Sequence, residues 1–182
     1  MIFSYIVCLS GITNHWKKMR VSVLEIWAQL ENVTNLKVTS QYEYHMKFKC
    51  NNCGTETENF MTFSDDNKVP LMGGKSFVNL IFKCKTCSRP SNVSVIEGSI
   101  RPYLAEDSLN FKPFVEFDCR GCDPLLFEPI DHFQCTNMDN TTEFNEVDLS
   151  ELNWADYDER SNESVGIYDF KYRFTTVKKS TK

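Results

Sequence analysis

Two Cys-x-x-Cys motifs, one at Cys50 and Cys53 and one at Cys84 and Cys87, place the strongest constraint on how this chain can fold. Each motif can present two thiolates from one tight turn, so together they can supply four sulfur ligands to one ion. Zn²⁺ takes this tetrahedral arrangement in closed structural sites, where it needs four good donors and no redox chemistry. The spacing therefore predicts a zinc site with these four cysteines as ligands. Two disulfides, or four unrelated buried thiols, are the alternative interpretation.

The residues before each motif have the pattern of a strand that runs into a turn. In residues 46–50 (MKFKC), the apolar side chains and the cysteine alternate with lysines, and residues 80–84 (LIFKC) lead into the second motif in a similar way. Four thiolates around a divalent cation leave a net negative charge, which nearby ammonium groups stabilise. The candidate ammonium groups belong to Lys47, Lys49, Lys83 and Lys85.

Composition narrows the class of protein. The chain has 182 residues, of which 41% are hydrophobic and 13% aromatic, so it can bury a core. Its formal net charge of −5 argues against a nucleic-acid-binding protein, because such proteins need a basic surface. Six of the eight cysteines fall in Cys-x-x-Cys pairs, which favours metal binding in a reducing compartment over an extracellular disulfide framework. We therefore expect a cytoplasmic protein.

Residues 1–18 are interpreted as an N-terminal extension, disordered or artefactual, with Met19 as the candidate start of the functional protein. The apolar stretch 1–12 is too short to span a bilayer, and its basic residues follow it instead of preceding it, the reverse of a secretory signal. An atypical targeting peptide is the alternative. The sequence therefore predicts no membrane association.

The rest of the chain favours an all-β fold, because no segment shows a sustained apolar stripe with helical spacing. Strands are predicted at residues 21–30, 41–50, 55–63, 77–83, 92–100 and 165–174. We expect two related β-sandwich-like halves, at residues 19–100 and 101–177, with residues 178–182 as a tail. The first half carries a zinc-ribbon-like site.

The second half repeats part of the first, because residues 114–122 (FVEFDCRGC) restate the strand and Cys-x-x-Cys turn of residues 44–53. No fourth pair follows, so the second half lacks a full set of four cysteines. Cys119 and Cys122 are acceptable zinc ligands together with His132 and Cys135. The alternative is that Cys119 is a small buried hydrophobic residue and that the others are incidental.

Residues 143–163 are acidic and polar and are broken up by Leu149, Leu152 and Trp154. A segment of this kind can dock a basic partner. We interpret it instead as a solvated loop or short helix that Trp154 and Tyr157 fix to the core.

Several motifs together resemble those of the eukaryotic CXXC-motif-containing zinc-binding proteins, a family catalogued as a domain of unknown function. They are the two cysteine pairs and residues 30–36 (LENVTNL), 73–74 (GG), 114–121 (FVEFDCRG), 154–159 (WADYDE) and 163–168 (ESVGIY). The resemblance implies an all-β cytosolic protein of two related halves without established catalysis. It also implies one zinc ion held by Cys50, Cys53, Cys84 and Cys87, and an association with the copper chaperone for superoxide dismutase. The N-terminal extension and Cys122 depart from the family pattern.

The sequence thus predicts a non-enzymatic, monomeric zinc-binding protein with a structural site of four cysteines that interacts with a protein partner. The alternative function is thiol-redox or copper-handling chemistry at Cys119 and Cys122, the pair that the zinc site leaves free. Hydrolysis is the least favoured activity, because four cysteine ligands leave zinc no open position for water.

Overall fold

The structure is a computed structural model that describes residues 18–40, 42–71, 73–74 and 76–180. The described part is all-β, as predicted, apart from one short 3₁₀ turn, η1 (Ala105–Asp107). The predictions for residues 1–17 lie outside the described residues. The chain begins its first strand, β1, at Lys18.

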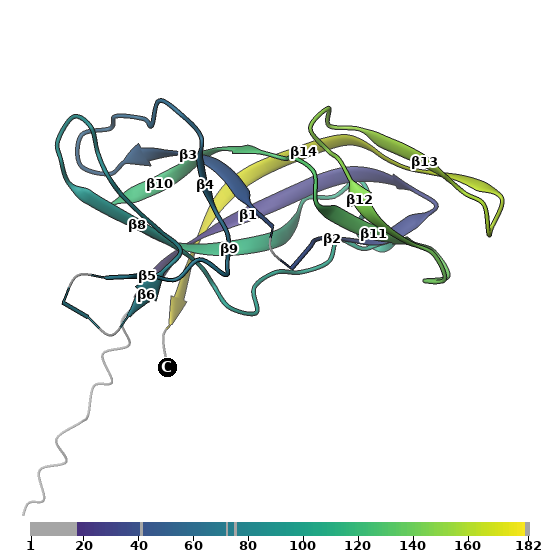
Figure 1. The fold of residues 1–182 in the computed structure, drawn as a ribbon, viewed down its shortest axis with the longest axis horizontal. Coiled ribbons are helices and arrows are strands. Elements are labelled where there is room, and N and C mark those ends of the chain that lie inside the picture. The colour runs from purple at the N-terminus through teal and green to yellow at the C-terminus, as the bar shows by residue number, and fades with distance from the viewer. Residues whose placement is uncertain (1–17, 41, 72, 75, 181–182) are drawn as a thin grey trace, which may run out of the picture.

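The largest sheet has six antiparallel strands, with two long strands, β14 and β1, near its middle (Figure 1). In spatial order its strands are β13 (Trp154–Asp158), β14 (Glu163–Ser180), β1 (Lys18–Glu31), β9 (Lys112–Arg120), β8 (Pro90–Val95) and β7 (Leu80–Lys83). β14 is longer than the predicted strand and includes residues 178–180 of the expected tail.

Three smaller sheets complete the fold. Their strands are β10 (Cys122–Glu128), β3 (Tyr44–Cys50) and β4 (Met61–Phe63) in the first, β12 (Glu143–Val147), β11 (Phe133–Asn137) and β2 (Val33–Val38) in the second, and β5 (Val69–Pro70) and β6 (Phe77–Val78) in the third. The molecule is elongated: the first of these sheets lies at one end and the second towards the other, with β1 and β14 running between them (Figure 1).

Strands from both sides of the expected boundary near residue 101 are mixed within the sheets. The six-stranded sheet combines β1, β7 and β8 with β9, β13 and β14, and each three-stranded sheet also takes strands from both sides. The two halves therefore do not form separate sheets. Their origin by duplication stays a prediction.

The core is rich in aromatic rings because the strands alternate as the sequence predicts. Along β3, Tyr44, Met46 and Phe48 are fully buried while the intervening side chains are more exposed. Tyr44 packs edge-on against Phe117 with ring centroids 5.4 Å apart. Each fully buried side chain of this size stabilises the fold by about 1.5–3 kcal/mol. At the other end Phe133 packs against Phe114 and Phe170.

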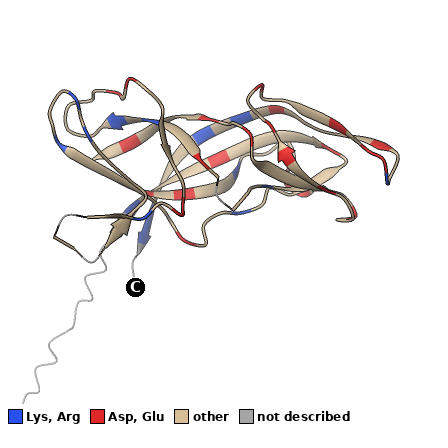
Figure 2. Cartoon of the chain, viewed as in Figure 1, with Lys and Arg blue, Asp and Glu red and all other residues tan. Residues whose placement is uncertain are grey.

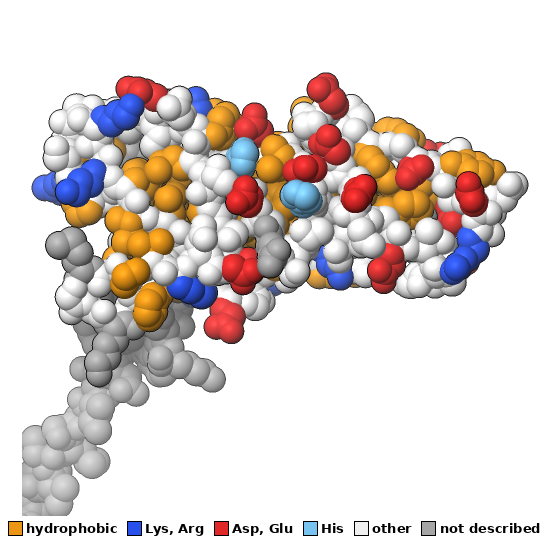
Figure 3. All heavy atoms as spheres, in the orientation of Figure 1, with side chains coloured by type: hydrophobic (Ala, Val, Ile, Leu, Met, Phe, Trp, Pro, Cys, Tyr) orange, Lys and Arg blue, Asp and Glu red, His pale blue; other side chains and the backbone are white. Residues whose placement is uncertain are grey.

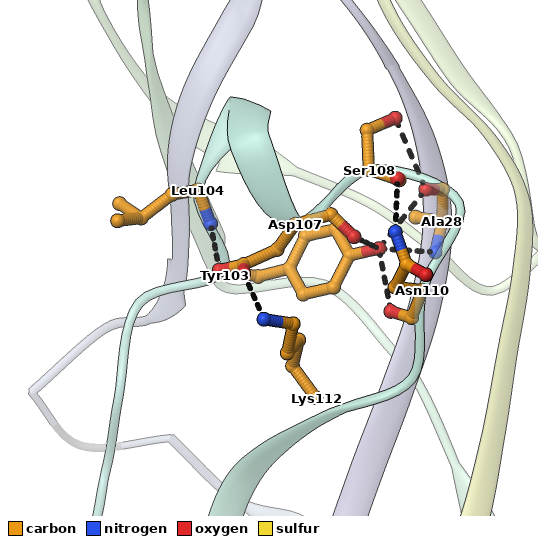
Figure 4. Close-up of polar contacts among 7 residues, drawn as sticks. All are labelled: Ala28, Tyr103, Leu104, Asp107, Ser108, Asn110 and Lys112. Carbon is orange, nitrogen blue, oxygen red and sulfur yellow. Dashed lines mark hydrogen bonds and ion pairs between the residues drawn. The ribbon is translucent and has the colours of Figure 1, made fainter.

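Tyr103 anchors β1 near its C-terminal end, at Ala28 (Figure 4). The register between β1 and β14 shifts here, because Ala28 of β1 lies opposite two residues of β14, Asp169 and Phe170, which form a bulge. The N–H of Ala28 donates to the Tyr103 hydroxyl (3.3 Å), and the hydroxyl lies 2.7 Å from the carbonyl oxygen of Asp107 and 3.0 Å from that of Asn110. The carbonyl of Ala28 accepts from the N–H of Leu109 (2.9 Å). The bulge thus leaves no buried backbone group of Ala28 unpaired.

The acidic segment 143–163 differs from the prediction, because it forms the strands β12 and β13 instead of a loop or short helix. Trp154 is partly buried against the core, as predicted, and its ring also packs edge-on against Phe144 of the same segment at 5.4 Å between centroids. Tyr157 is exposed instead of packed. Acidic residues of this segment lie on β12, on β13 and in the connection between them (Figure 2). The negative charge of segment 143–163 therefore lies at the end of the molecule away from β3 and β8.

Candidate metal centre

The first Cys-x-x-Cys motif forms a tight turn where β3 ends. The N–H of Cys50 donates to the carbonyl of Thr55 (2.9 Å), and the N–H of Gly54 donates back to the carbonyl of Cys50 (2.9 Å). Gly54 has a φ of 76°, in the left-handed region that glycine adopts without strain. These bonds close the turn and place Cys50 and Cys53 on one side of it.

The second motif, between β7 and β8, repeats these bonds. The N–H of Cys84 donates to the carbonyl of Arg89 (3.0 Å), and the N–H of Ser88 donates to the carbonyl of Cys84 (2.9 Å). Ser88 takes the left-handed conformation of Gly54, with a φ of 58°. Both turns therefore present their sulfur atoms through the same local geometry.

The two turns face one another, and the four sulfur atoms all lie within 4.8 Å of each other. The Sγ atoms of Cys50 and Cys87 are 3.7 Å apart, and those of Cys53 and Cys84 are 3.4 Å apart. Zn–S bonds of about 2.3 Å in a tetrahedron place sulfurs roughly 3.8 Å apart, whereas a disulfide needs about 2.05 Å. The predicted clustering is confirmed, and the donor set fits Zn²⁺.

The sulfurs differ in burial and in proton affinity. Cys50 and Cys84 are buried, Cys87 is half-buried and Cys53 is exposed. Hydrogen bonding with the side chain and the backbone of Thr55 lowers the pKa of Cys53 to about 6. The N–H of Arg89 does the most to lower the pKa of Cys87. Two cysteines are therefore biased towards the thiolate, which is the form that binds metal.

The pKa of Cys84 is shifted in the opposite direction. The N–H groups of Cys87 and Thr86 favour its thiolate, but burial and hydrogen bonding with Cys53 and Cys87 outweigh them and raise its pKa. Without a cation, four thiolates at these distances repel one another, so protons stay in the cluster. A divalent cation displaces those protons and removes the repulsion.

The lysines near the turns have different surroundings from those that the sequence suggests. Lys85 forms an ion pair with Glu58, and the ammonium group of Lys47 lies over the ring of Phe60, 5.1 Å from its centroid. The side chain of Lys49 lies beside the first turn: its Cε would be 3.9 Å from the Cβ atom of a residue that replaced Gly54. The electrostatic support predicted for the cluster is therefore divided among other contacts.

Gly121 supports the centre, and sequence reasoning missed it. Its carbonyl accepts from the N–H of Asn51 in the first turn (3.0 Å). A Cβ atom on Gly121 would lie 2.8 Å from the carbonyl oxygen of Pro90, which follows the second turn. Its φ of 81° also requires glycine. A glycine between two cysteines is a sequence signal for such a conformation, but the close approach to Pro90 depends on the fold.

The structure does not bring the candidates for a second metal site together. Among the described residues, the cluster of Cys50, Cys53, Cys84 and Cys87 is the only group of three or more potential ligands at metal-binding distance. Cys122 and Cys135 are buried in the core, and burial raises the pKa of Cys135 to about 12. His132 is exposed, and its Nε2 atom lies 3.5 Å from the Oδ2 atom of Asp131.

The geometry also argues against thiol-redox chemistry at Cys119 and Cys122. A hydrogen bond with Cys122 and burial together raise the pKa of Cys119 well above that of a free thiol. A redox-active cysteine needs a lowered pKa and access to its substrate. Cys122 is fully buried. Cys119 therefore lacks the lowered pKa, and Cys122 lacks the access to substrate.

Comparison with known proteins gives consistent matches. The family described as "CXXC motif containing zinc binding protein, eukaryotic" matches residues 23–175. The protein named "CXXC motif containing zinc binding protein" from Xenopus laevis is 40% identical over 84% of this chain and 96% of its own length. The Homo sapiens protein of the same name is 39% identical over 83% of this chain and 95% of its own length.

Two solved structures share the fold. The crystal structure of C1orf123 has a TM-score of 0.83 and 37% identity, over 86% of this chain and 99% of that one. A hypothetical protein from Plasmodium falciparum has a TM-score of 0.80 over 86% of this chain and 100% of its own, and at 23% identity it supports the fold alone. In the part of the chain that is described, no helix is long and apolar enough to cross a membrane.

Proposed function

The chain belongs to the family of eukaryotic CXXC motif containing zinc binding proteins, and from this we propose that its zinc site is structural and its function non-enzymatic. The observation that carries the proposal is the closed cluster of four sulfurs, whose atoms all lie within 4.8 Å of one another. Cys50, Cys53, Cys84 and Cys87 fill the four positions of a tetrahedral ion. No position is left at which zinc could activate a water molecule.

The cation has a clear mechanical role at this position. Cys50 ends β3 in a three-stranded sheet, whereas Cys84 follows β7 at the edge of the six-stranded sheet. A single ion bound to both turns joins the two sheets at one end of the molecule. Because the ligand set exists only in the folded chain, the free energy of zinc binding is also free energy of folding.

The resemblance described above supports two further parts of the proposal. The protein acts in the cytoplasm as an interaction module, and its partner is the copper chaperone for superoxide dismutase. A direct test is isothermal titration of the zinc-loaded protein with that chaperone. Saturable binding with a defined stoichiometry supports the proposal, and no heat of binding at concentrations up to about 100 μM contradicts it.

Metal analysis tests the zinc site itself. We expect purified protein to contain one zinc ion per chain, and we expect Cys50→Ser and Cys87→Ser to lose the metal and much of the thermal stability. Cys119→Ser is the matched control, because it removes a partly buried cysteine outside the cluster and should retain zinc. A well-folded wild-type protein without metal, or zinc lost from the Cys119 variant alone, would contradict the assignment.

A further inference from the structure

A cavity of about 380 Å³ adjoins the cysteine cluster and is lined by two of its members, Cys50 and Cys84. Segment 55–62, which leaves the first turn, forms one wall, and β7 with the second turn forms the other. Its apolar lining comes from Phe48, Phe60, Met61, Leu80 and Phe82. Hydrophobic side chains also reach the surface at this end of the molecule, which holds β3, β4 and β8 (Figure 3). The volume and lining of the cavity are typical of sites that bind one compact apolar group with a few polar contacts at the rim.

One wall of the cavity is the edge of a sheet. β7 pairs with β8 on one side, and the described residues provide no strand on its other side. Its backbone groups facing away from β8 are thus available to an added strand. Extended peptides bind in this way, with main-chain hydrogen bonds along the edge and alternate side chains in pockets. Leu80 and Phe82, two residues apart on β7, both line the cavity.

The charges at the rim favour an acidic ligand. Lys83 and Lys85 line the cavity together with Glu56 and Glu58, and Glu58 is already paired with Lys85. Among the described residues, Lys83 has no carboxylate within ion-pair distance. The same holds for Lys47, which covers Phe60. Within the described part of the chain, Glu56 on the same rim is also without an ion-pair partner, so the ammonium groups of Lys83 and Lys47 outnumber the remaining carboxylate by one and leave a net positive charge for a ligand.

The zinc centre and the cavity share their walls. Cys50 and Cys84 contribute to the lining, and so do Thr55 and Thr86, whose hydroxyl groups are hydrogen-bonded across the two turns (3.0 Å). The separation of the two walls thus depends on the separation of the two turns. An ion that fixes the turns also fixes the width of the cavity.

We propose that this cavity is the docking site for an extended, acidic segment of a partner protein, which adds as a strand to β7 and places a large apolar side chain against Phe60, Leu80 and Phe82. The proposal rests on the structural role of zinc argued above. Occupation of the site requires the metal, because only the metal-bound turns hold both walls in place. Lys83 selects a carboxylate beside the apolar side chain.

The test uses ¹⁵N-labelled, zinc-loaded protein and three capped peptides of matched length: Asp-Phe-Thr-Phe-Asp, Lys-Phe-Thr-Phe-Lys and Asp-Ala-Thr-Ala-Asp. We expect the first peptide to cause saturable shifts in the amide signals of residues 55–62 and 80–86, and to bind about tenfold more tightly than either of the others. Shifts spread over the whole surface, or equal affinity for all three peptides, would overturn the proposal.

Variants locate the binding site. Phe60→Ser changes a half-buried side chain of the cavity and should weaken binding of the first peptide about tenfold, whereas Phe77→Ser, 59% exposed on β6 outside the cavity, should not. Lys83→Glu should weaken it about fivefold, and Lys178→Glu, exposed on β14, should leave it unchanged. Equal effects in either pair would refute the location.

Zinc dependence separates the two proposals. If protein stripped of zinc by a chelator remains folded and binds the first peptide as well as the loaded protein does, the link between metal and cavity is wrong. If the loaded protein carries one zinc ion per chain but binds none of the peptides, the docking site is wrong while the structural zinc site stands. Loss of peptide binding on zinc removal, with recovery on adding zinc back, supports both.

Discussion

Replacing Gly121 by alanine tests how the two cysteine turns are held together by the protein itself. Gly121 has a φ of 81°, and a Cβ atom there would lie 2.8 Å from the carbonyl oxygen of Pro90 and 3.0 Å from the Oγ of Ser91. The Pro90 oxygen belongs to the backbone and cannot rotate away. The substitution therefore adds a steric overlap to the strain of a left-handed alanine.

The two contributions can be separated with a control. Gly98 has a similar φ of 70°, but a Cβ atom there has no neighbour within 4 Å. Gly98→Ala should therefore show only the backbone strain, about 1–2 kcal/mol. Gly121→Ala should lose that amount and about 1–3 kcal/mol more, because the Pro90 backbone must move to relieve the overlap.

Urea unfolding of both zinc-loaded variants measures the free energies, with a shared m-value as the condition for comparing them. Because the carbonyl of Gly121 accepts from the N–H of Asn51, we also expect Gly121→Ala to weaken zinc binding in a competition with a chromophoric chelator. Gly98→Ala should bind zinc as the wild type does. Equal losses of stability in the two variants would refute the reasoning.

Two further predictions concern other buried polar groups. Tyr103→Phe removes the acceptor of the Ala28 N–H and should reduce the free energy of unfolding by about 1–3 kcal/mol. Tyr157→Phe is the control, because it loses only an exposed hydrogen bond to Asn162 and should change the free energy of unfolding by less than about 0.5 kcal/mol. Similar losses of stability in the two variants would contradict the anchoring role of Tyr103. Burial would raise the pKa of Asp158, but hydrogen bonds from its neighbours, Asn137 foremost, lower it to about 2. The ionised form therefore stabilises the fold above about pH 4, and this stability is lost as the pH falls from about 4 to about 2. Asp158→Asn should flatten the dependence of Tm on pH in that interval, and an unchanged slope would contradict this.

The cysteine cluster was predictable because the local sequence of each turn determines its geometry. The two-residue spacer and the residue after the second cysteine fix the local hydrogen bonds, and the same bonds form at Gly54 and at Ser88. The strands that lead into the turns were predictable for a similar reason, since the alternation of Met46 and Phe48 with lysines sets which face is buried.

What the sequence could not specify is long-range pairing. β1 pairs with β14, almost 150 residues later in the chain, and no local pattern announces that partner. Residue type alone also gave wrong predictions where the position of the side chain in the fold decides its contacts. Cys135 and His132 are acceptable zinc ligands, but strand pairing buries the first opposite Phe144 and leaves the second at the surface beside Asp131. Lys85 is likewise close to the turn, yet its ammonium group pairs with Glu58.

The contacts between the two cysteine turns explain why the cation matters here and not throughout the fold. Among the described residues, no backbone hydrogen bond joins turn 50–55 to turn 84–89. Apart from the sulfurs, the Thr55–Thr86 hydroxyl pair links them, and the exposed Lys85–Glu58 ion pair beside it contributes little. The aromatic cluster around Phe133 lies at the far end of β1 and β14 and shares none of these contacts. Loss of zinc should therefore first open the cavity between segment 55–62 and β7, while the far end of the molecule keeps its packing.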